Sequence, residues 1–555
     1  MYEQLLEPLK YYNDVGKKQH EENTKEYFEA LFNKSGVDAE ENRRTAKEYR
    51  SELEKIKKTG KLLFWLRALQ IFLIALAVVG AIVTVFVWYA GIPIAAVALL
   101  LLFLLVRPKI KSVKAKKAEL EKKANELLRL AESQVAPLNS LFTESDTIRI
   151  IEKTMPGLEF ERQFSLTQES FLREKHDFLD LNNSESTMLN TLSGKIFGNP
   201  FIFCERLMHR LVDKVYHGTL VISWTETYRD SKGNVRTRRR TQTLHASVTK
   251  PFPEYQRHNF LGYGCQAAPD LSFERNPTDV EKMNEKQIEK FVRKGAKKFK
   301  KKSENATKKG GNFQEMTNTE FDVIFGAMNR DNEVQFRLMY TPLAQRNTLE
   351  LIKDKTNFGD DFRFIKNKRF NIIDSEHAQK WSIDTSPKHY YSYDIDEIKK
   401  NFALFNAAYF KSVFFDFAPL FAVPAYLEEP CASLEVPEGA KCTYSAYEHE
   451  VMANAIGYRR FVHESSDTPA ILKTIGLGKI GGGDNVVVTA HSYNAVNRVD
   501  LIPVLGGDGM FHPVPVPWVE YIPLTKVTNM TVSKEKSEDV DTVGFHGLWA
   551  KIQNS

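Results

Sequence analysis

The chain has few cysteines, and none of them belongs to a paired motif. Its 555 residues contain four, Cys204, Cys265, Cys431 and Cys442, and no two are spaced as CxxC. This excludes a zinc ribbon and a thioredoxin-type redox motif. If the large soluble part faces the cytoplasm, its thiols are expected to stay reduced. A Cys431–Cys442 disulfide is expected only with the reverse orientation.

Charge is also absent from one long stretch. Residues 68–106 contain no Asp, Glu, Lys or Arg, and Gln70 is the only amide side chain among them. A helix pair in a soluble core rarely runs this far without a charged face, so the stretch indicates insertion into a membrane. A cleaved signal peptide does not fit, because a long and mostly polar segment precedes the stretch.

The uncharged stretch is long enough for two spans. A bilayer core about 30 Å thick requires about 20 helical residues. Residues 68–90 meet this length, and residues 94–106, or 90–106 with a longer start, form a second candidate. Residues 91–93 contain a Gly and a Pro and predict a turn between them. We expect a transmembrane helical hairpin. Neither span has an ionisable residue of the kind that marks an ion path, so we interpret the hairpin as an anchor.

Positive charge flanks both ends of this hairpin, whereas its turn carries none. Lysine and arginine are enriched in cytoplasmic flanks of membrane spans. We therefore expect a multi-pass protein of the cell membrane that contacts the bilayer through residues 68–106 and has both termini in the cytoplasm. The flanking cations are Lys55, Lys57, Lys58, Lys61 and Arg67 before the stretch and Arg107, Lys109, Lys111, Lys114, Lys116 and Lys117 after it.

The segments around the spans predict further helices. Residues 1–45 form a charged helical segment, and residues 46–67 and 107–137 carry apolar or small residues at a three-four spacing. This spacing favours an antiparallel coiled-coil stalk. The alternative is that each helix is solvated on all sides. The predicted seams are Ala46, Tyr49, Leu53, Ile56, Gly60 and Leu63 on the first helix and Ile110, Val113, Lys117, Leu120, Ala124, Leu127 and Ala131 on the second.

The rest of the chain mixes helical and strand patterns, so the predicted fold class is an α+β membrane protein. We divide it into an α+β domain over residues 138–375 and a helical, then β-rich, C-terminal region over residues 376–555. The predicted strands are 193–203 with a turn at Gly198 and Asn199, 218–229 with 235–248, 320–325 with 333–340, 362–364 with 369–373, and several within 459–532. The predicted helices are 342–353, 394–410 and 447–456.

Four stretches carry a resemblance to a known family. They are residues 193–205 (SGKIFGNPFIFCE), 217–222 (HGTLVI), 321–353 with its Arg-Leu-x-x-Thr-Pro element, and 361–373 (DFRFIKNKRFNII). Over about residues 60–375 the chain resembles an uncharacterised family of bacterial membrane proteins, defined only as a domain of unknown function. The resemblance implies two adjacent N-terminal spans and a large cytoplasmic α+β domain. It implies no known activity.

Two motifs suggest a cofactor or metal, and each has a simpler alternative. In the glycine-rich residues 476–484 no Ser or Thr follows Lys479 and a β-branched run comes next, so a hairpin loop is favoured over a phosphate-binding loop. His449 and Glu450 begin a zincin-like pattern, but Ala453 stands where the second histidine is required. We predict no cofactor and no metal ligand.

A catalytic interpretation is equally weak. His491, Ser492, Asp500 and His512 supply the residue types of a Ser-His-Asp triad within one β-rich region. A triad is defined by geometry, however, and no G-x-S-x-G elbow supports this one, so chance proximity is favoured. Cys265 is either a nucleophile or a small buried thiol, and the buried thiol is favoured. We assign no catalytic residue.

Lysines cluster over residues 290–309 and predict a cationic helix. We expect it to bind anionic lipid headgroups; nucleic acid binding and a merely solvated surface are the alternatives. Phe291 and Phe299 either insert at the membrane interface or form core contacts. A second basic patch, Arg236 with residues 238–240, is interpreted as charge on an exposed strand edge. The candidate lipid-binding residues are Lys294, Lys297, Lys298, Lys300, Lys301 and Lys302.

Two function classes stay open. We favour a non-catalytic, membrane-anchored binding or scaffold protein whose cytoplasmic part docks lipid or an unidentified protein partner, with homo-oligomerisation compatible with this function. The alternative is a membrane-tethered enzyme with an unrecognised site in the C-terminal β-rich region. A pocket with converging titratable groups would favour the enzyme, whereas a flat apolar patch would favour docking.

Overall fold

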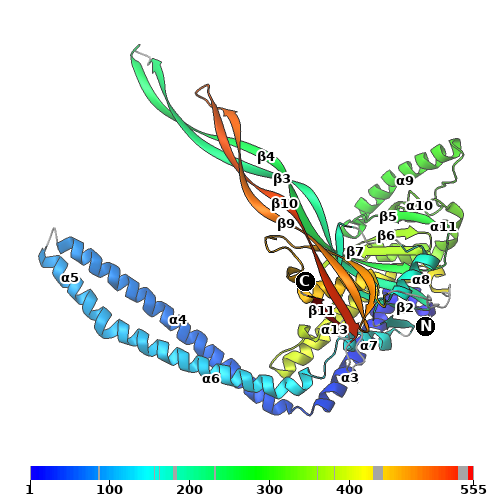
Figure 1. Cartoon of the computed structure of the whole chain (residues 1–555), viewed down its shortest axis with the longest axis horizontal. Helices are drawn as coiled ribbons and strands as arrows, with labels where there is room; N and C mark the ends of the chain where they lie inside the picture. Colours follow the sequence, from blue (N-terminus) through cyan, green and yellow to red (C-terminus); the bar gives the residue numbers. More distant parts are fainter. Residues whose placement is uncertain are drawn as a thin grey trace. The chain divides into compact units, whose positions relative to one another are not determined.

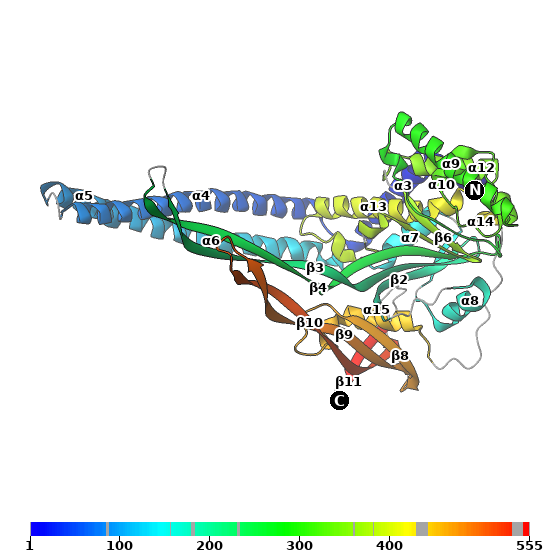
Figure 2. The same cartoon turned by 90° about the horizontal axis from the view of Figure 1, so that it is seen from above.

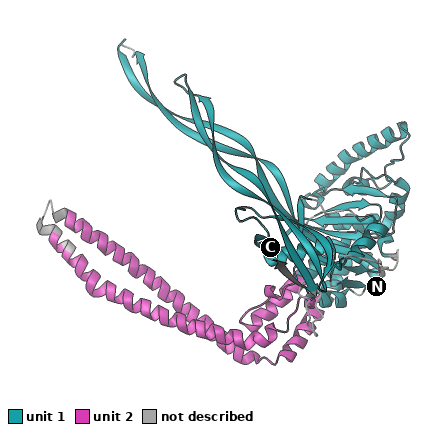
Figure 3. Cartoon of the chain, viewed as in Figure 1, with its two compact units in different colours: residues 1–19, 147–385, 409–555 teal, residues 20–146, 386–408 magenta. Residues whose placement is uncertain are grey.

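The structure is a computed structural model of the chain. It describes residues 2–84, 88–155, 157–161, 163–178, 184–229, 233–358, 361–380, 382–428, 442–534 and 548–553. The fold is mixed α+β and divides into two compact units (Figure 3). Unit 1 contains residues 1–19, 147–385 and 409–555, and unit 2 contains residues 20–146 and 386–408. The predicted division at residues 375 and 376 therefore does not coincide with a boundary between units.

Unit 2 is built on a helical hairpin, in which α4 runs in one direction and α5, the π-helical η2 and α6 return along it (Figure 1). Among the described residues, one helix, over Ala39–Ile82 of α4, holds a stretch long and apolar enough to cross a membrane. The elements of this unit are α3 (Lys17–Ser35), α4 (Ala39–Thr84), α5 (Trp88–Leu101), η2 (Leu102–Val106), α6 (Arg107–Asn139), η5 (Pro387–His389) and the start of α13 (Ile395–Phe421).

The predicted turn at residues 91–93 is wrong, because Gly91 and Pro93 lie inside α5. In the structure α4 ends at Thr84 and α5 begins at Trp88. Pro93 is the sixth residue of α5 and has no backbone N–H, so it removes one helical hydrogen bond, the bond to the Tyr89 carbonyl. The second apolar helix thus starts earlier than the sequence pattern suggested.

The predicted α6 seam agrees with the burial seen in the structure, since all seven of its residues are buried or partly buried. On α4 the prediction fails at one position. Leu53 is 41% exposed, and its neighbour Glu52 occupies the seam with only 4% of its surface exposed. Glu52 takes the buried position, where its carboxylate pairs with Lys123 of α6.

Unit 1 contains a seven-stranded antiparallel sheet in the order β1-β2-β3-β4-β7-β6-β5. Its two longest strands extend the predicted 218–229 and 235–248 pair. The turn between β2 and β3 lies at Phe197 and Gly198, whose φ angles of 51° and 83° suit a two-residue hairpin. The strands are β1 (Leu158–Glu161), β2 (Ser186–Ile196), β3 (Asn199–Arg229), β4 (Val235–Gly264), β5 (Ser272–Arg275), β6 (Phe362–Asn367) and β7 (Phe370–Ser375).

A second antiparallel sheet has the order β11-β10-β9-β8, with β8 (Ile471–Ile480), β9 (Gly483–Leu505), β10 (Phe511–Lys534) and β11 (Leu548–Gln553). The β9–β10 hairpin packs on the β3–β4 hairpin, and the four strands form a long two-layer projection that we call the β arm (Figure 2). Ile222, Leu244 and Val514 form its buried centre. Gly218 is required there, because a Cβ atom would overlap the Pro515 carbonyl oxygen.

Helices cover the remainder of unit 1. The predicted strand pair at residues 320–325 and 333–340 is wrong, because both segments are helices. Asn318 and Asn332 cap α10 and α11 by accepting hydrogen bonds from backbone N–H groups. A short apolar run does not distinguish a strand from a buried helix, which explains the error. The prediction of α12 from Thr341-Pro342 is confirmed, with Thr341 as the N-cap.

The part of α13 after residue 408 belongs to unit 1. The remaining helices of this unit have the following bounds. They are α1 (Tyr2–Leu5), α2 (Pro8–Tyr11), η1 (Tyr12–Gly16), α7 (Ser145–Thr154), α8 (Leu166–His176), η3 (Val280–Lys282), α9 (Glu285–Lys308), α10 (Thr319–Phe325), α11 (Glu333–Met339), α12 (Pro342–Lys353), η4 (Ala378–Lys380), α14 (Ala425–Glu428), α15 (Ala446–Gly457) and η6 (Tyr458–Arg460). The predicted helices 394–410 and 447–456 correspond to α13 and α15.

Candidate functional site

The lysine cluster lies on α9, which begins at a capping box. The Asn284 side chain accepts a hydrogen bond from the Gln287 N–H, and the Gln287 side chain accepts one from the Asn284 N–H. One face of α9 is buried against α10, where Phe299 packs with Phe313 and Val323. These contacts fix which way the helix faces.

Close packing reinforces this orientation. A Cβ atom on Gly295 would overlap a methyl group of Val323, so the side chain of Val323 on α10 packs directly against the backbone of α9. Phe291 packs partly buried against the same cluster, and Phe299 is 4% exposed. Both rings are core contacts and are not placed to insert into a membrane.

The outward face of α9 is cationic. Lys294, Lys297, Lys298, Lys300 and Lys301 are exposed. Lys302, the sixth predicted residue, turns back to the domain.

The Lys302 Nζ donates to the Met328 carbonyl oxygen, and it lies 4.7 Å from the centre of the Phe313 ring. The structure thus presents five of the six predicted lysines to solvent, and it uses the sixth to hold α9 in place.

The arginine patch on β4 is engaged within its own hairpin. Arg238 and Arg240 donate to Glu226 on β3, at 2.9 and 2.5 Å, and Arg239 donates to Ser223. These contacts support the interpretation of the patch as structural charge on an exposed strand.

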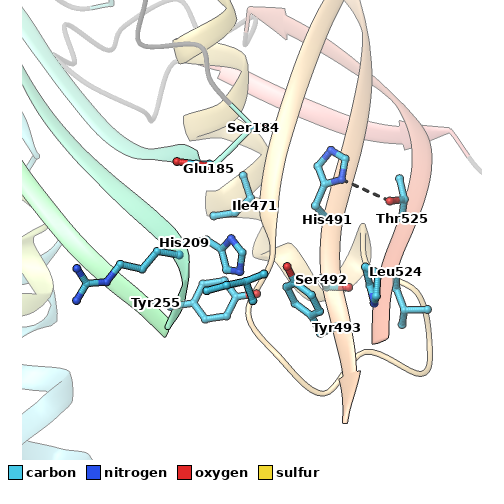
Figure 4. Close-up of a pocket in the computed structure, with 13 residues that line it drawn as sticks. Ser184, Glu185, His209, Tyr255, Ile471, His491, Ser492, Tyr493, Leu524 and Thr525 are labelled. Atoms are coloured by element: carbon cyan, nitrogen blue, oxygen red, sulfur yellow. Dashed lines mark hydrogen bonds between the residues drawn. The ribbon is translucent and has the colours of Figure 1, made fainter. Parts of the chain in front are cut away.

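A pocket of about 510 Å³ opens where β3 and β4 diverge from the second sheet (Figure 4). It is bordered by residues 184–185, 209–211, 255, 471, 491–493 and 523–525. His209 and Tyr255 lie on one wall, and Ser492 and Tyr493 lie on the facing wall. Its volume is in the range of small-molecule sites.

Three rings meet in this pocket. The centre of the His209 ring is 5.1 Å from that of Tyr255 and 5.3 Å from that of Tyr493. Burial lowers the pKa of His209, partly offset by the charge of Glu185, and thus favours the neutral ring. Burial raises the pKa values of both tyrosines.

Two polar atoms of the pocket are buried without a hydrogen-bond partner among the described residues, the Ser492 Oγ and the His209 Nε2. Sequence reasoning singled out Ser492 but missed His209, Tyr255 and Tyr493. They lie on three strands that are distant in the sequence and carry no local motif.

The predicted triad is not assembled. His491 and Ser492 are consecutive in β9, so their side chains leave opposite faces of the strand. The His491 Nδ1 instead lies 3.4 Å from the Thr525 Oγ1 on β10. Asp500, about 26 Å farther along β9, accepts hydrogen bonds from other groups.

The Asp500 carboxylate accepts from the Lys250 ammonium and from the Trp518 indole, each at 2.8 Å. The His512 Nε2 lies 2.9 Å from an Asp508 oxygen in the turn that follows β9. Neither Asp500 nor His512 borders the pocket.

The zincin-like pattern is a structural contact. The His449 Nε2 on α15 lies 3.2 Å from the Asp484 carboxylate, and both side chains are 1% exposed. Asp484 also accepts from the backbone N–H groups of Thr443 and Tyr444. Among the residues that the structure describes, no group of three or more His, Cys, Asp or Glu side chains is placed to hold a metal ion.

Two other sequence candidates are also structural. The glycine-rich segment is the β8–β9 hairpin, with Gly481 and Gly482 at positive φ in its two-residue turn, which confirms the hairpin interpretation. Cys265 is completely buried, as expected for a packed thiol. Cys431, considered for a disulfide with Cys442, lies outside the described residues.

Two carboxyl groups lie on α15: Glu448, which sequence reasoning missed, and Glu450, which it considered only as part of the zincin-like pattern. Burial raises the pKa of Glu448 and of Glu450 to about 7 in each case. Glu448 accepts a hydrogen bond from the Thr191 hydroxyl, and Glu450 accepts one from the Met188 N–H and pairs with Lys473. Because these bonds join α15 to β2 and β8, the two groups have a structural role.

Comparisons of this chain with protein-family models, with curated proteins and with solved structures found no match. The resemblance to an uncharacterised bacterial family therefore stays a hypothesis, and the function has to be argued from the molecule itself.

Proposed function

We propose that this chain is a membrane-anchored binding or scaffold protein with two transmembrane spans and both termini in the cytoplasm. In this proposal the helical hairpin of unit 2 inserts into the bilayer. The cationic face of α9 in unit 1 binds the anionic headgroups of the inner leaflet. The membership of the family named above, which implies the same layout, belongs to the same proposal.

The exposed surface of the helical hairpin supports insertion. Apolar side chains are exposed on several sides of α4, α5 and η2. The buried residues described in these helices form a thin seam that includes Leu73, Leu102 and Val106. In water this surface would be unfavourable, whereas lipid solvates it. The most exposed apolar residues are Phe64, Trp65, Ile71, Phe72, Val78, Val79, Ile82, Ile92, Val97, Leu100, Phe103, Leu104 and Leu105.

A second span is supported by the length of the returning helix. From its start, α5 supplies 14 residues and η2 another five, without an Asp, Glu, Lys, Arg or His. This total is close to the length of about 20 residues that a bilayer requires. Lysine and arginine follow at the start of α6 and precede the apolar part of α4, so the positive-inside rule favours cytoplasmic ends for both helices.

The observation that carries the lipid-binding part is the way α9 is docked. Its apolar face and Gly295 are fixed on α10, so the exposed lysines are held outward as a group. Lys294 and Lys301 are about 10 Å apart along the axis, which is comparable to the Debye length of about 8 Å at physiological ionic strength. Each lysine close to an anionic surface contributes about 1 kcal/mol.

Tethering by the hairpin makes even weak attraction effective, because the lipid surface is then present at high local concentration. The test uses the full chain in nanodiscs of neutral lipid, and it measures flotation of these nanodiscs with vesicles of phosphatidylcholine or of phosphatidylcholine with phosphatidylglycerol. We expect binding to the anionic vesicles in low salt and release in high salt.

The decisive variant changes five residues, Lys294→Glu, Lys297→Glu, Lys298→Glu, Lys300→Glu and Lys301→Glu, and it should abolish flotation without lowering the melting temperature. A control with the same total change of charge replaces Lys175, Lys214, Lys380, Lys388 and Lys479, which are exposed elsewhere, and should keep most of the binding. An equal loss of vesicle binding in both variants would show that net charge alone explains the binding. Tighter, salt-sensitive binding to single-stranded RNA than to vesicles would make nucleic acid the partner.

The alternative, a membrane-tethered enzyme, has less support. The aromatic pocket holds titratable groups, as an enzyme site would. Among its described lining residues, however, Ser492 has no hydrogen bond to His209 or to His491 that would activate it as a nucleophile. These groups therefore support binding better than catalysis.

A further inference from the structure

The pocket of Figure 4 has walls that suit a flat ring. The rings of Tyr255, His209 and Tyr493 lie close together, and the aliphatic side chains of Ile471 and Leu524 complete the walls. Aromatic groups pack favourably against one another in stacked or edge-on arrangements. An aromatic ligand can therefore extend a cluster that the protein has already formed.

The aromatic walls are held in place by a hydrogen-bonded loop. The Tyr255 hydroxyl lies 3.2 Å from the Thr468 Oγ1, and this same oxygen accepts a hydrogen bond from the Tyr493 N–H. The Asp467 N–H donates to the Tyr493 carbonyl oxygen. The two tyrosines are thus positioned before any ligand arrives, which reduces the entropic cost of binding.

Two unsatisfied polar atoms indicate that the ligand carries a polar group. The Ser492 Oγ is buried, with 2% of the residue exposed, and has no partner among the described residues, as is also true of the His209 Nε2. Buried polar groups in folded proteins almost always have a partner. A ligand with a hydrogen-bond donor and an acceptor would satisfy both atoms.

The charges around the pocket favour a neutral ligand. Glu185 and Arg210 are exposed at its rim, and Arg210 pairs with Glu254. His491 is bonded to Thr525, and the partly buried His209 ring packs against two tyrosine rings. A charged ligand would lose its hydration here without gaining an opposite charge in the interior of the pocket.

We propose that this pocket binds an uncharged planar ring that carries a hydrogen-bond donor and an acceptor, with the ring against His209, Tyr255 and Tyr493 and its polar group at Ser492. The binding or scaffold protein would then respond to a small neutral aromatic or heteroaromatic compound. This inference does not depend on membrane binding by α9.

The test uses the full chain in nanodiscs and ligand-observed saturation-transfer NMR. Benzamide is the probe, because it is planar and neutral and has both a donor and an acceptor. Cyclohexanecarboxamide replaces the flat ring by a puckered one, and benzoate and benzylammonium carry charge. We expect saturable binding of benzamide and binding of the other three that is at least about tenfold weaker.

Two near-isosteric variants locate the site. Ser492→Ala and His209→Phe each remove one unsatisfied atom and should weaken benzamide binding about tenfold. Matched controls are Ser193→Ala and Tyr216→Phe, which remove equally buried and unpartnered hydroxyls away from the pocket and should leave binding unchanged. The probe partitions into lipid equally with every variant, so this partition does not affect the comparison between variants.

Saturable binding of benzamide that both pocket variants weaken would support the proposal. Equal binding of the puckered or charged probes would overturn it, as would benzamide binding that survives both substitutions. If none of the four probes binds saturably, water rather than a ligand satisfies the two polar atoms, and the proposal is also overturned. The probe series requires only the unmodified protein, so the test stands even if a variant fails to fold.

Discussion

Glu52 of α4 and Lys123 of α6 form an ion pair across the helical hairpin, with the Glu52 Oε1 and the Lys123 Nζ 3.0 Å apart. Lys55 donates to the same carboxylate oxygen, also at 3.0 Å. The carboxylate thus occupies a seam position that the sequence pattern assigned to Leu53. Polar contacts of this kind fix the register of paired helices.

The first prediction concerns the pH dependence of this contact. The hydrogen bonds from Lys123 and from Lys55 lower the pKa of Glu52 below its ordinary value of 4.5. A lowered carboxyl pKa gives stability that is present above the unfolded-state pKa and is lost as the pH falls through the folded-state pKa. Glu52→Gln should therefore lower the melting temperature at pH 7, and this loss should become smaller as the pH falls through the folded-state pKa of Glu52.

Circular dichroism of the full chain in nanodiscs measures this difference. Leu53→Gln is the control, because Leu53 lies outside the seam and its replacement should change stability by less than about 0.5 kcal/mol. A larger loss for Leu53→Gln than for Glu52→Gln at pH 7 would restore the seam that the sequence predicted.

The sequence predicted the helical hairpin and most of both seams because periodic patterns are local. The α6 seam from Ile110 to Ala131 agrees at each position, since it repeats over several turns. The segments at residues 320–325 and 333–340 failed because they are too short to show a period, and they are helices held by caps and burial. Only tertiary packing brings Tyr255 and Tyr493 together, so no local signal identified the pocket.

The second prediction tests the orientation of the proposed spans. The cysteine-less chain with Thr84→Cys, at the end of α4, should react with a membrane-impermeant maleimide on intact cells. The same chain with Lys479→Cys, which is exposed in the β8–β9 hairpin, should react only after lysis. Labelling of Lys479→Cys on unbroken cells would place unit 1 outside the cell. A Cys431–Cys442 disulfide would then be expected.

The third prediction concerns Glu448, whose pKa burial raises to about 7 from an ordinary value of 4.5. For a carboxyl group with a raised pKa, the folded state binds a proton that the unfolded state has released. This site should therefore lower the free energy of unfolding as the pH rises from about 4.5 to 7. Glu448→Gln keeps an acceptor for Thr191 and should stabilise the protein by about 3 kcal/mol at pH 8.

The same variant should have almost no effect at pH 4, where Glu448 is protonated in both states. Chemical denaturation at the two pH values measures the difference. Glu174→Gln, at an exposed position on α8, is the control and should show no such dependence. Destabilisation by Glu448→Gln at pH 8 would mean that the ionised carboxylate is the form that the fold requires.

The last prediction concerns the two layers of the β arm. Gly218 on β3 faces the Pro515 carbonyl oxygen on β10, and a Cβ atom there would overlap it. Ile222, Leu244 and Val514 are buried between the same layers, so the strands cannot separate locally without exposing them. Gly218→Ala should therefore cost about 1–3 kcal/mol, as is typical when atoms are added to a packed interior.

Hydrogen exchange of the β3 and β10 amides in the full chain measures this loss, which should appear as faster exchange along the arm. Thr219→Ala is the matched control, because Thr219 is the next residue, exposed on the opposite face. If the two layers move as one body, the protection of amides from exchange should decrease in both hairpins together in Gly218→Ala. Faster exchange confined to β3 would show that the layers open independently, and unchanged exchange in both variants would contradict the close approach at Gly218.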